Sequence, residues 1–323
     1  MIRRLTTVQL PDWAQRTHPF LRYELTRISH ASRRAQYLRA LWVVLFGLAL
    51  IVGGYVVATN LLTQPAGQNL TESALAVIYW PLLLIQLAMR VVAFVMTGGV
   101  ISEEKRRQTW DSVRATEDGA ALTLRTRWAA LFYRLRLPLI VVTVIRALLV
   151  LGILYDLTAF QGRYLDLLIN GIVPDVALPI AAVLLAFFMT SSLLLPLTGV
   201  GFDAAVGLLV ASVFQQRTYA ALAQILLVLA RVLIAALLIF GATEFARGSL
   251  EASDLGAWLL ITTFAAMGDW GLALLNLGFY GEIWATVPFG IFIGLALLVF
   301  SMLQAMLTDW LLNVAIRVAE RNG

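Results

Sequence analysis

Four ionisable side chains lie inside long apolar stretches of the sequence, where a charge needs a partner. They are Arg90, Arg146, Asp203 and Arg231. At the centre of a lipid bilayer a charged side chain costs at least about 2.5 kcal/mol unless it is paired or hydrated. Asp203 and Arg231 lie at similar distances from the polar turn that separates their apolar stretches, so we expect them to form an ion pair. For this pair a structural clamp is favoured over a substrate site.

Arg90 and Arg146 have a different expected environment, nearer one membrane surface. A long arginine side chain can extend along apolar surface and place its guanidinium among lipid headgroups. The sequence therefore favours contact with lipid for both residues. A vestibule that binds anions is the alternative.

Several kinds of active site are missing from the sequence. There is no Gly-x-x-x-x-Gly-Lys-Ser/Thr phosphate-binding loop, and Lys105 is the only lysine. Cysteine is absent and His18 and His30 are the only histidines, which argues against the common metal sites. Segments 201–203 (Gly-Phe-Asp) and 267–269 (Met-Gly-Asp) only faintly resemble the carboxylate motifs of membrane aspartyl proteases. We therefore expect no cofactor and no catalytic site in this chain.

A polar segment between two apolar stretches has the pattern of a short helix. Glu103 and Arg107, and then Arg107 and Asp111, are four residues apart, a spacing that stabilises a helix by about 0.2–0.5 kcal/mol per pair. Trp110 and Val113 would share one side of it, and an exposed Trp beside arginines is typical of a protein interface. The alternative is that Trp110 lies in the headgroup layer of a membrane. We expect this segment to bind a partner protein.

The composition assigns the elements around these residues to a membrane. The chain is 60% hydrophobic and 13% charged, whereas soluble domains are roughly 25% charged. Apolar stretches reach the roughly 20 residues that a helix needs to cross a bilayer. The predicted fold is all-α, with an N-terminal segment 1–40 and a transmembrane domain 41–323. Six spans are expected, at about 41–62, 74–99, 137–157, 176–214, 219–242 and 283–307.

Arginine-rich segments set the expected orientation. Residues 1–40 and 100–136 are strongly basic, which places both segments, and with them both termini, on the cytoplasmic side of the cell membrane. The positive net charge is thus explained without nucleic acid. Part of 1–40 has the pattern of an interfacial helix, with a plain basic flank as the alternative. Residues 255–277 are expected to form outer re-entrant or interfacial helices, with a seventh span as the alternative. A kink or break is expected near Pro196.

The polar segment resembles the first cytoplasmic loop of permease subunits of type-2 ABC exporters. That family's pattern is Glu-x-x-x-x-Thr-Trp/Leu-Asp/Glu-x-Leu/Val-x-x-Thr, and it is matched by Glu104, Thr109, Trp110, Asp111, Val113 and Thr116. Residues 18–25 resemble the family's Asn-Pro-x-Leu-x-x-Glu-Leu element, with His18 in place of Asn, and residues 207–212 resemble the end of its fourth span. The family usually has Pro after the last Thr, whereas Glu-Asp-Gly stands here at 117–119.

The resemblance implies a transport function that needs partners. Residues 103–116 would be a coupling helix that docks on a separate ATPase subunit, and that subunit would bind ATP and Mg²⁺. The implied contact residues are Glu103, Glu104, Arg107, Thr109, Trp110, Asp111, Val113 and Thr116. Two permease subunits, identical or paralogous, would pair in the membrane and export a substrate by alternating access. The alternative is a permease-like structural or assembly subunit of another membrane complex.

Overall fold

The described residues are helical and contain no strand, as predicted. The computed structural model describes residues 10–26, 70–99, 101, 104, 108, 110, 115–116, 118–158, 176–214, 216–275, 283 and 286–321. The expected first span at 41–62 and the second half of the N-terminal segment lie outside these residues.

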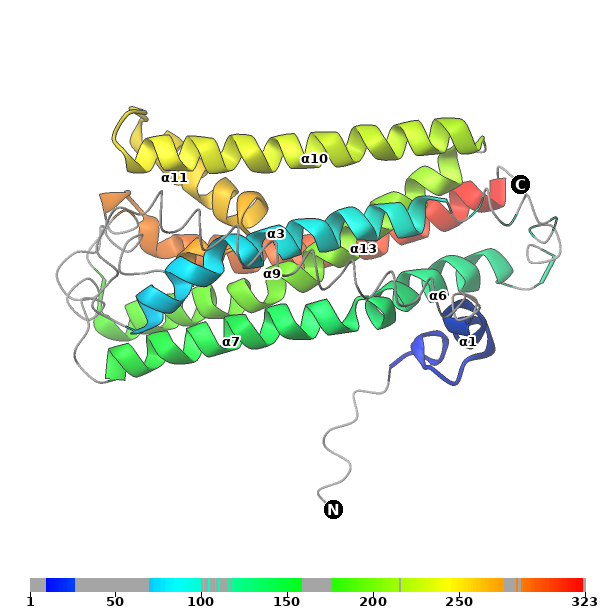
Figure 1. The fold of residues 1–323 in the computed structure, drawn as a ribbon, viewed down its shortest axis with the longest axis horizontal. Coiled ribbons are helices and arrows are strands. Elements are labelled where there is room, and N and C mark those ends of the chain that lie inside the picture. Colours follow the sequence, from blue (N-terminus) through cyan, green and yellow to red (C-terminus); the bar gives the residue numbers. More distant parts are fainter. Residues whose placement is uncertain are drawn as a thin grey trace, which may run out of the picture.

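Five helices are long and apolar enough to cross a membrane. They are α3 (Leu70–Gly98), α7 (Arg136–Thr158), α9 (Leu178–Val213), α10 (Arg217–Ala246) and α13 (Ile293–Arg321). Four of them coincide closely with predicted stretches, whereas α13 overlaps the predicted stretch 283–307 but begins and ends later. All five run along the long axis of the molecule (Figure 1). These apolar helices indicate a multi-pass membrane protein.

Shorter helices lie towards the two ends of this bundle (Figure 1). They are η2 (Asp12–Ala14), α1 (Pro19–Thr26), α6 (Gly119–Arg134), α11 (Asp254–Thr263), the π-helical η3 (Phe264–Gly268), η4 (Ala273–Leu275) and η5 (Gly290–Phe292). We call one end the α6 end, where α1, the start of α6 and the chain's C-terminus lie, and the other the α11 end (Figure 1). At the α6 end, Leu21 of α1 packs against Ala129 and Ala130 of α6.

Helix α9 is the centre of the bundle and packs against both α3 and α13. Glycines allow these close approaches. A Cβ on Gly207 would lie 2.1 Å from the Thr97 hydroxyl of α3, and a Cβ on Gly294 of α13 would lie 2.8 Å from the Leu184 carbonyl oxygen of α9. The helix continues through Pro196 as one element, so the break does not occur, and the alternative of a kink stays a prediction.

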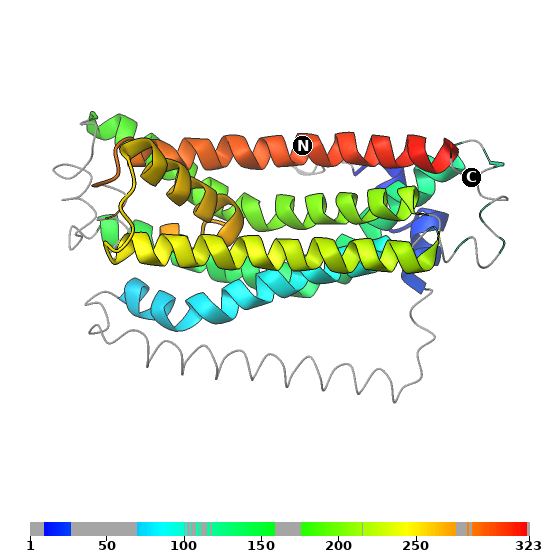
Figure 2. The same cartoon turned by 90° about the horizontal axis from the view of Figure 1, so that it is seen from above.

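Residues 254–268 enter the bundle from the α11 end without crossing it. Helix α11 and η3 together are shorter than a span, so the described residues do not form the alternative seventh span. Figure 2 shows α11 running obliquely inward from that end. The chain then turns at Asp269 and Trp270, which are fully buried.

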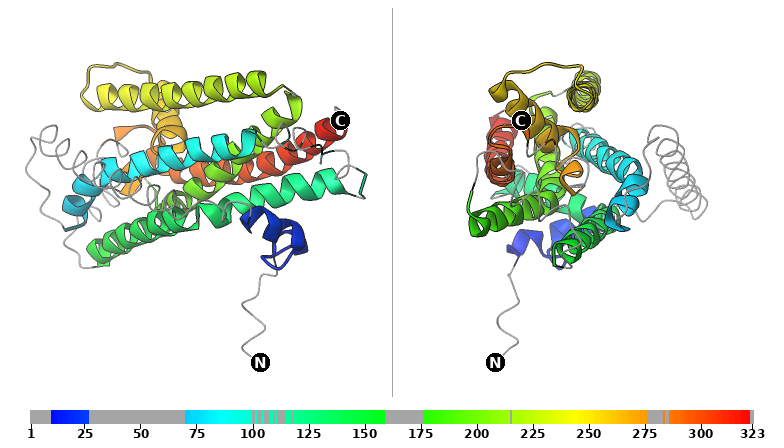
Figure 3. Two further views of the ribbon diagram at one scale, coloured as in Figure 1. Left: turned by 45° about the vertical axis from the view of Figure 1, so that its right-hand side comes forward. Right: turned by 90° about the vertical axis from the view of Figure 1, so that its left-hand side faces the viewer.

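Helix α10 lies at the edge of the bundle, above α3 and α11 (Figure 3). Only 11% of the most apolar stretch of α10 is buried inside the protein, against 33–44% for the corresponding stretches of the other four long helices. Helix α10 is therefore the least buried of the five long helices.

Replacing Gly294 tests the close approach of α13 to α9. We expect Gly294→Ala to lower the free energy of unfolding by about 1–3 kcal/mol, because the new methyl group overpacks against backbone. The measurement is the thermal unfolding midpoint of the purified chain in mild detergent. Gly99→Ala is the matched control, since no atom lies within 4 Å of its Cβ position. Equal midpoints for the two variants would contradict this packing.

Candidate functional site

The loop after α3 is fastened to the bundle by Trp110. This side chain is 2% exposed and belongs to an apolar cluster with Leu124 of α6, Leu208 of α9 and Leu312 of α13. The prediction that Trp110 is exposed is therefore wrong. The ends of three helices converge here, and the indole fills the space between them. Its Nε1 has no hydrogen-bond partner in the part of the chain that is described.

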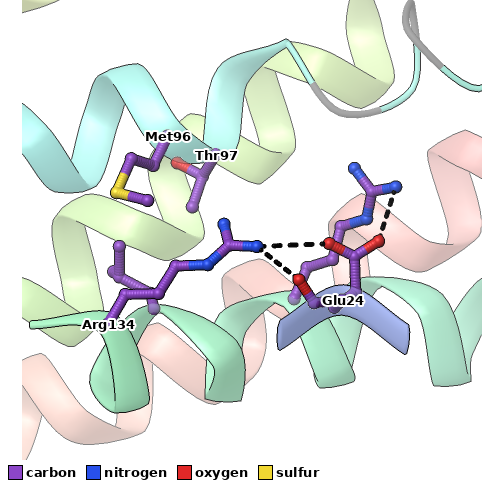
Figure 4. Close-up of a pocket in the computed structure, with 6 residues that line it drawn as sticks. Glu24, Met96, Thr97 and Arg134 are labelled. Carbon is purple, nitrogen blue, oxygen red and sulfur yellow. Dashed lines mark hydrogen bonds and ion pairs between the residues drawn. The ribbon is translucent and has the colours of Figure 1, made fainter. Parts of the chain in front are cut away.

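Glu104 is buried in the same region and forms an ion pair with Arg127 of α6. Nη2 of Arg127 also lies 3.0 Å from Oε1 of Glu24 in α1. Arg134 lies on the same face of α6, about two turns further along. It donates a 2.8 Å hydrogen bond from Nη2 to the Glu24 carbonyl oxygen (Figure 4). Two carboxylates and two guanidiniums thus join three separate pieces of chain: α1, the loop and α6. We call these four residues the tether cluster.

Glu24 and its neighbours also border a small cavity at the α6 end. Met96, Thr97 and Leu131 complete its lining together with Arg127 and Arg134 of the tether cluster. In Figure 4 the Arg134 side chain extends across it from α6 towards Glu24, with Thr97 above. The end of α3 therefore borders the same cavity as the ion pairs.

The remaining predicted contact residues of the loop divide into two groups. Thr116 is described and exposed. Glu103, Arg107, Thr109, Asp111 and Val113 lie outside the described residues. Gln108, which no pattern singled out, is exposed and has a left-handed backbone with φ 56°. The described loop residues therefore show which side of the loop faces the helices.

Asp203 pairs with Arg90. The predicted ion pair between Asp203 and Arg231 is therefore wrong. Nε of Arg90 in α3 donates to Oδ2 of Asp203 in α9, and both side chains are 2% exposed. The Arg90 guanidinium also stacks on Trp270, with Cζ 5.0 Å from the ring centroid. A Cβ on Gly199 would lie 2.8 Å from that Cζ, so α9 leaves room for the arginine only because residue 199 has no side chain.

Arg231 of α10 lies near this pair without bonding to it. It is close enough to Arg90 and Asp203 for both charges to act on it. Its Nε and Nη2 atoms are buried and make no hydrogen bond within the described chain. Arg90 likewise has Nη1 and Nη2 buried without a partner there. We call Arg90, Asp203 and Arg231 the charge triad.

Arg146 of α7 is fully buried and holds the inner turn of the 254–275 segment. Its Nη1 donates to the Ser192 carbonyl oxygen and, at 2.8 Å, to that of Trp270. Its Nη2 donates at 2.6 Å to Oε1 of Gln86 and at 3.4 Å to the Asp269 carbonyl oxygen. The lipid-contact prediction is therefore wrong for Arg146, and for the equally buried Arg90. Backbone carbonyls turned inward satisfy Arg146 where lipid was expected.

The Asp269 carboxylate is also held by backbone groups. It accepts hydrogen bonds from the amides of Gly271 at 2.9 Å and Ala273 at 2.5 Å, and Tyr79 Oη lies 3.5 Å away. Asp203 is bound to Arg90. The two carboxylates of the faint protease-like motifs are thus engaged with separate partners.

Comparison with known proteins adds no family assignment. No family model, curated protein or solved structure matches the chain.

Removing Arg127 tests the tether cluster. We expect Arg127→Met to lower the free energy of unfolding by about 3–5 kcal/mol, because it leaves Glu104 and Glu24 buried with less compensating charge. The thermal unfolding midpoint in mild detergent measures the effect. Arg125→Met on the same helix is the control, since Arg125 is half-buried and bonds only to Asn313 among the described residues. A midpoint shift no larger than the control's would rule out a stabilising tether.

Removing Arg146 tests whether the inner turn depends on it. We expect Arg146→Gln to destabilise the chain by about 3 kcal/mol or more, because buried carbonyls and an amide lose a charged donor. Arg136→Gln, an exposed position at the start of α7, should leave the unfolding midpoint within about 1 °C of wild type, since surface substitutions are usually near neutral. Comparable midpoints for both variants would show that the turn is held by packing alone.

Proposed function

We propose that this chain is the membrane-spanning permease subunit of an ATP-driven ABC exporter. The spans would be six, with residues 41–62 as the first. The α6 end would face the cytoplasm of the cell together with both termini, following the basic segments. Residues 254–275 would be a re-entrant element on the outer side, because their apolar helical part, residues 254–268, is shorter than a span.

The observation that carries this proposal is the attachment of the loop to the spans. Trp110 packs among the ends of α6, α9 and α13, and Glu104 is ion-paired to α6. A loop fastened in this way cannot move without moving the helix ends, because a buried indole and a buried ion pair resist separation. That is the property a coupling element needs.

The loop's two sides would then have different tasks. Glu104 and Trp110 would hold the loop to the bundle. Exposed Thr116, together with Glu103, Arg107, Thr109, Asp111 and Val113, would contact the ATPase subunit. ATP and Mg²⁺ would bind to that partner, since this chain has no phosphate-binding loop. Closure of two ATPase subunits would push on the loops of two paired permease subunits and reorient their spans.

Capture of the partner tests the proposal. The full chain is isolated from its own cells in mild detergent, and the co-purified proteins are identified by mass spectrometry and assayed for ATP hydrolysis. We expect a subunit that carries a Gly-x-x-x-x-Gly-Lys-Ser/Thr loop. Arg107→Glu should reduce its recovery about tenfold, as expected for loss of an interface contact of about 1.4 kcal/mol. The unfolding midpoint of the isolated variant is measured beside that of wild type, so that lower recovery counts as a lost contact only when the midpoint is unchanged.

Two further variants make the capture experiment specific. Arg321→Glu reverses an exposed charge at the same end of the bundle and should leave recovery unchanged. Trp110→Ala should lower both recovery and the unfolding midpoint, because the indole is buried. Recovery of a complex without any ATPase would favour the structural or assembly subunit instead.

A further inference from the structure

We propose that the charge triad is a binding site for the anionic headgroup of an amphipathic molecule. If the proposed transport function holds, this site names the class of substrate. The site lies where α3, α9 and α10 meet, on the side of the bundle that α10 covers (Figure 3).

Unused hydrogen-bond donors are the first argument. Nη1 and Nη2 of Arg90 and Nε and Nη2 of Arg231 are all buried and have no partner within the described chain. Arg90 is 2% exposed, so water does not satisfy it from outside. A buried donor without a partner destabilises the fold, and more so when it is charged. Four such nitrogen atoms on two neighbouring guanidiniums are what an oxyanion with several acceptor lone pairs would satisfy.

Charge balance is the second argument. The triad holds two positive charges and one negative charge, and the two arginines repel each other. Asp203 is already engaged through Oδ2 by Nε of Arg90. One further negative charge would neutralise the group in an apolar surrounding, where an uncompensated charge is most costly.

The packing indicates how a ligand would reach the site. Arg90 is fixed on two sides, by Trp270 and by the backbone at Gly199. Arg231 is on α10, the long helix with the least buried surface. Displacement of α10 from α3 would therefore expose both guanidiniums while the Arg90–Asp203 pair stays in place. This is the motion that alternating access would supply.

The surroundings favour an apolar tail on the ligand. Next to Arg231 on α10, Leu229, Val232 and Leu233 are exposed. In a bilayer this surface contacts hydrocarbon, so a headgroup at Arg231 would place its tail along α10. A free anion would have to cross the same hydrocarbon without a tail.

Equilibrium binding to the chain alone tests the site without any ATPase. The full chain is placed in phosphatidylcholine nanodiscs and titrated with radiolabelled dodecyl phosphate, and binding to empty nanodiscs is subtracted. We expect saturable binding that Arg231→Gln weakens at least about tenfold, because a charge-assisted contact is lost. Arg247→Gln is the matched control, since Arg247 lies at the end of the same helix with its side chain 68% exposed.

Competition identifies the source of the anion. Dodecyltrimethylammonium should not compete. If inorganic phosphate does not compete at millimolar concentration, the ligand is amphipathic, as we propose. If inorganic phosphate competes as strongly as unlabelled dodecyl phosphate, the site binds a free anion and the amphipathic ligand is ruled out. The double variant Arg90→Gln with Asp203→Asn removes the ion pair as a neutral unit and should also weaken binding, in case Arg231→Gln does not fold.

The inference fails if binding is absent, or if it is unchanged in both the Arg231 variant and the double variant. That result would leave the proposed function untouched, because capture of an ATPase does not depend on the triad. If no ATPase is captured but binding of dodecyl phosphate still depends on Arg231, the exporter proposal is rejected. The binding site would then stand without it.

Discussion

The fold depends on one constraint: guanidinium groups inside an apolar bundle must be satisfied by the protein itself. Arg146 meets it with carbonyl oxygens from α9 and from the turn at Trp270, and with the Gln86 amide. Those bonds explain why the turn at Asp269 and Trp270 lies inside the bundle, since its inward carbonyls and the arginine satisfy each other. Arg127 meets the same constraint at the α6 end with two glutamates. One set of bonds fixes the inner turn and the other fixes the loop.

The charge triad differs because it is only partly satisfied. Asp203 compensates one arginine, and the guanidinium of Arg90 is further stabilised by the Trp270 ring. Arg231 adds a second positive charge from the helix that is least embedded in the bundle. Structural clusters in this chain, such as the tether cluster, balance their charges. This imbalance is the reason why we propose a ligand site, and not a clamp, at the triad.

The sequence patterns predicted where the long helices lie, but not which side chains meet between them. Length and hydropathy located the five long apolar helices, with the bounds of α13 predicted too early, because each needs only its own residues. They placed Asp203 and Arg231 at one depth but could not show that Gly199 lets Arg90 approach from α3. Spacing put Trp110 and Val113 on one side of a helix without showing that three helix ends cover Trp110. The role of Arg127 was missed because its two glutamates are distant in sequence, although Glu24 belongs to the 18–25 pattern.

The proposed transport function requires that the loop after α3 contacts an ATP-hydrolysing subunit. Gln108 is exposed on that loop, so a photo-crosslinking amino acid placed there samples whatever the loop contacts in the intact cell membrane. We predict that illumination of living cells joins the chain to a protein with a phosphate-binding loop, and that the same residue placed at exposed Glu251, near the α11 end, does not. Crosslinks from Gln108 to lipid alone, or only to proteins without a nucleotide site, would contradict the proposed contact.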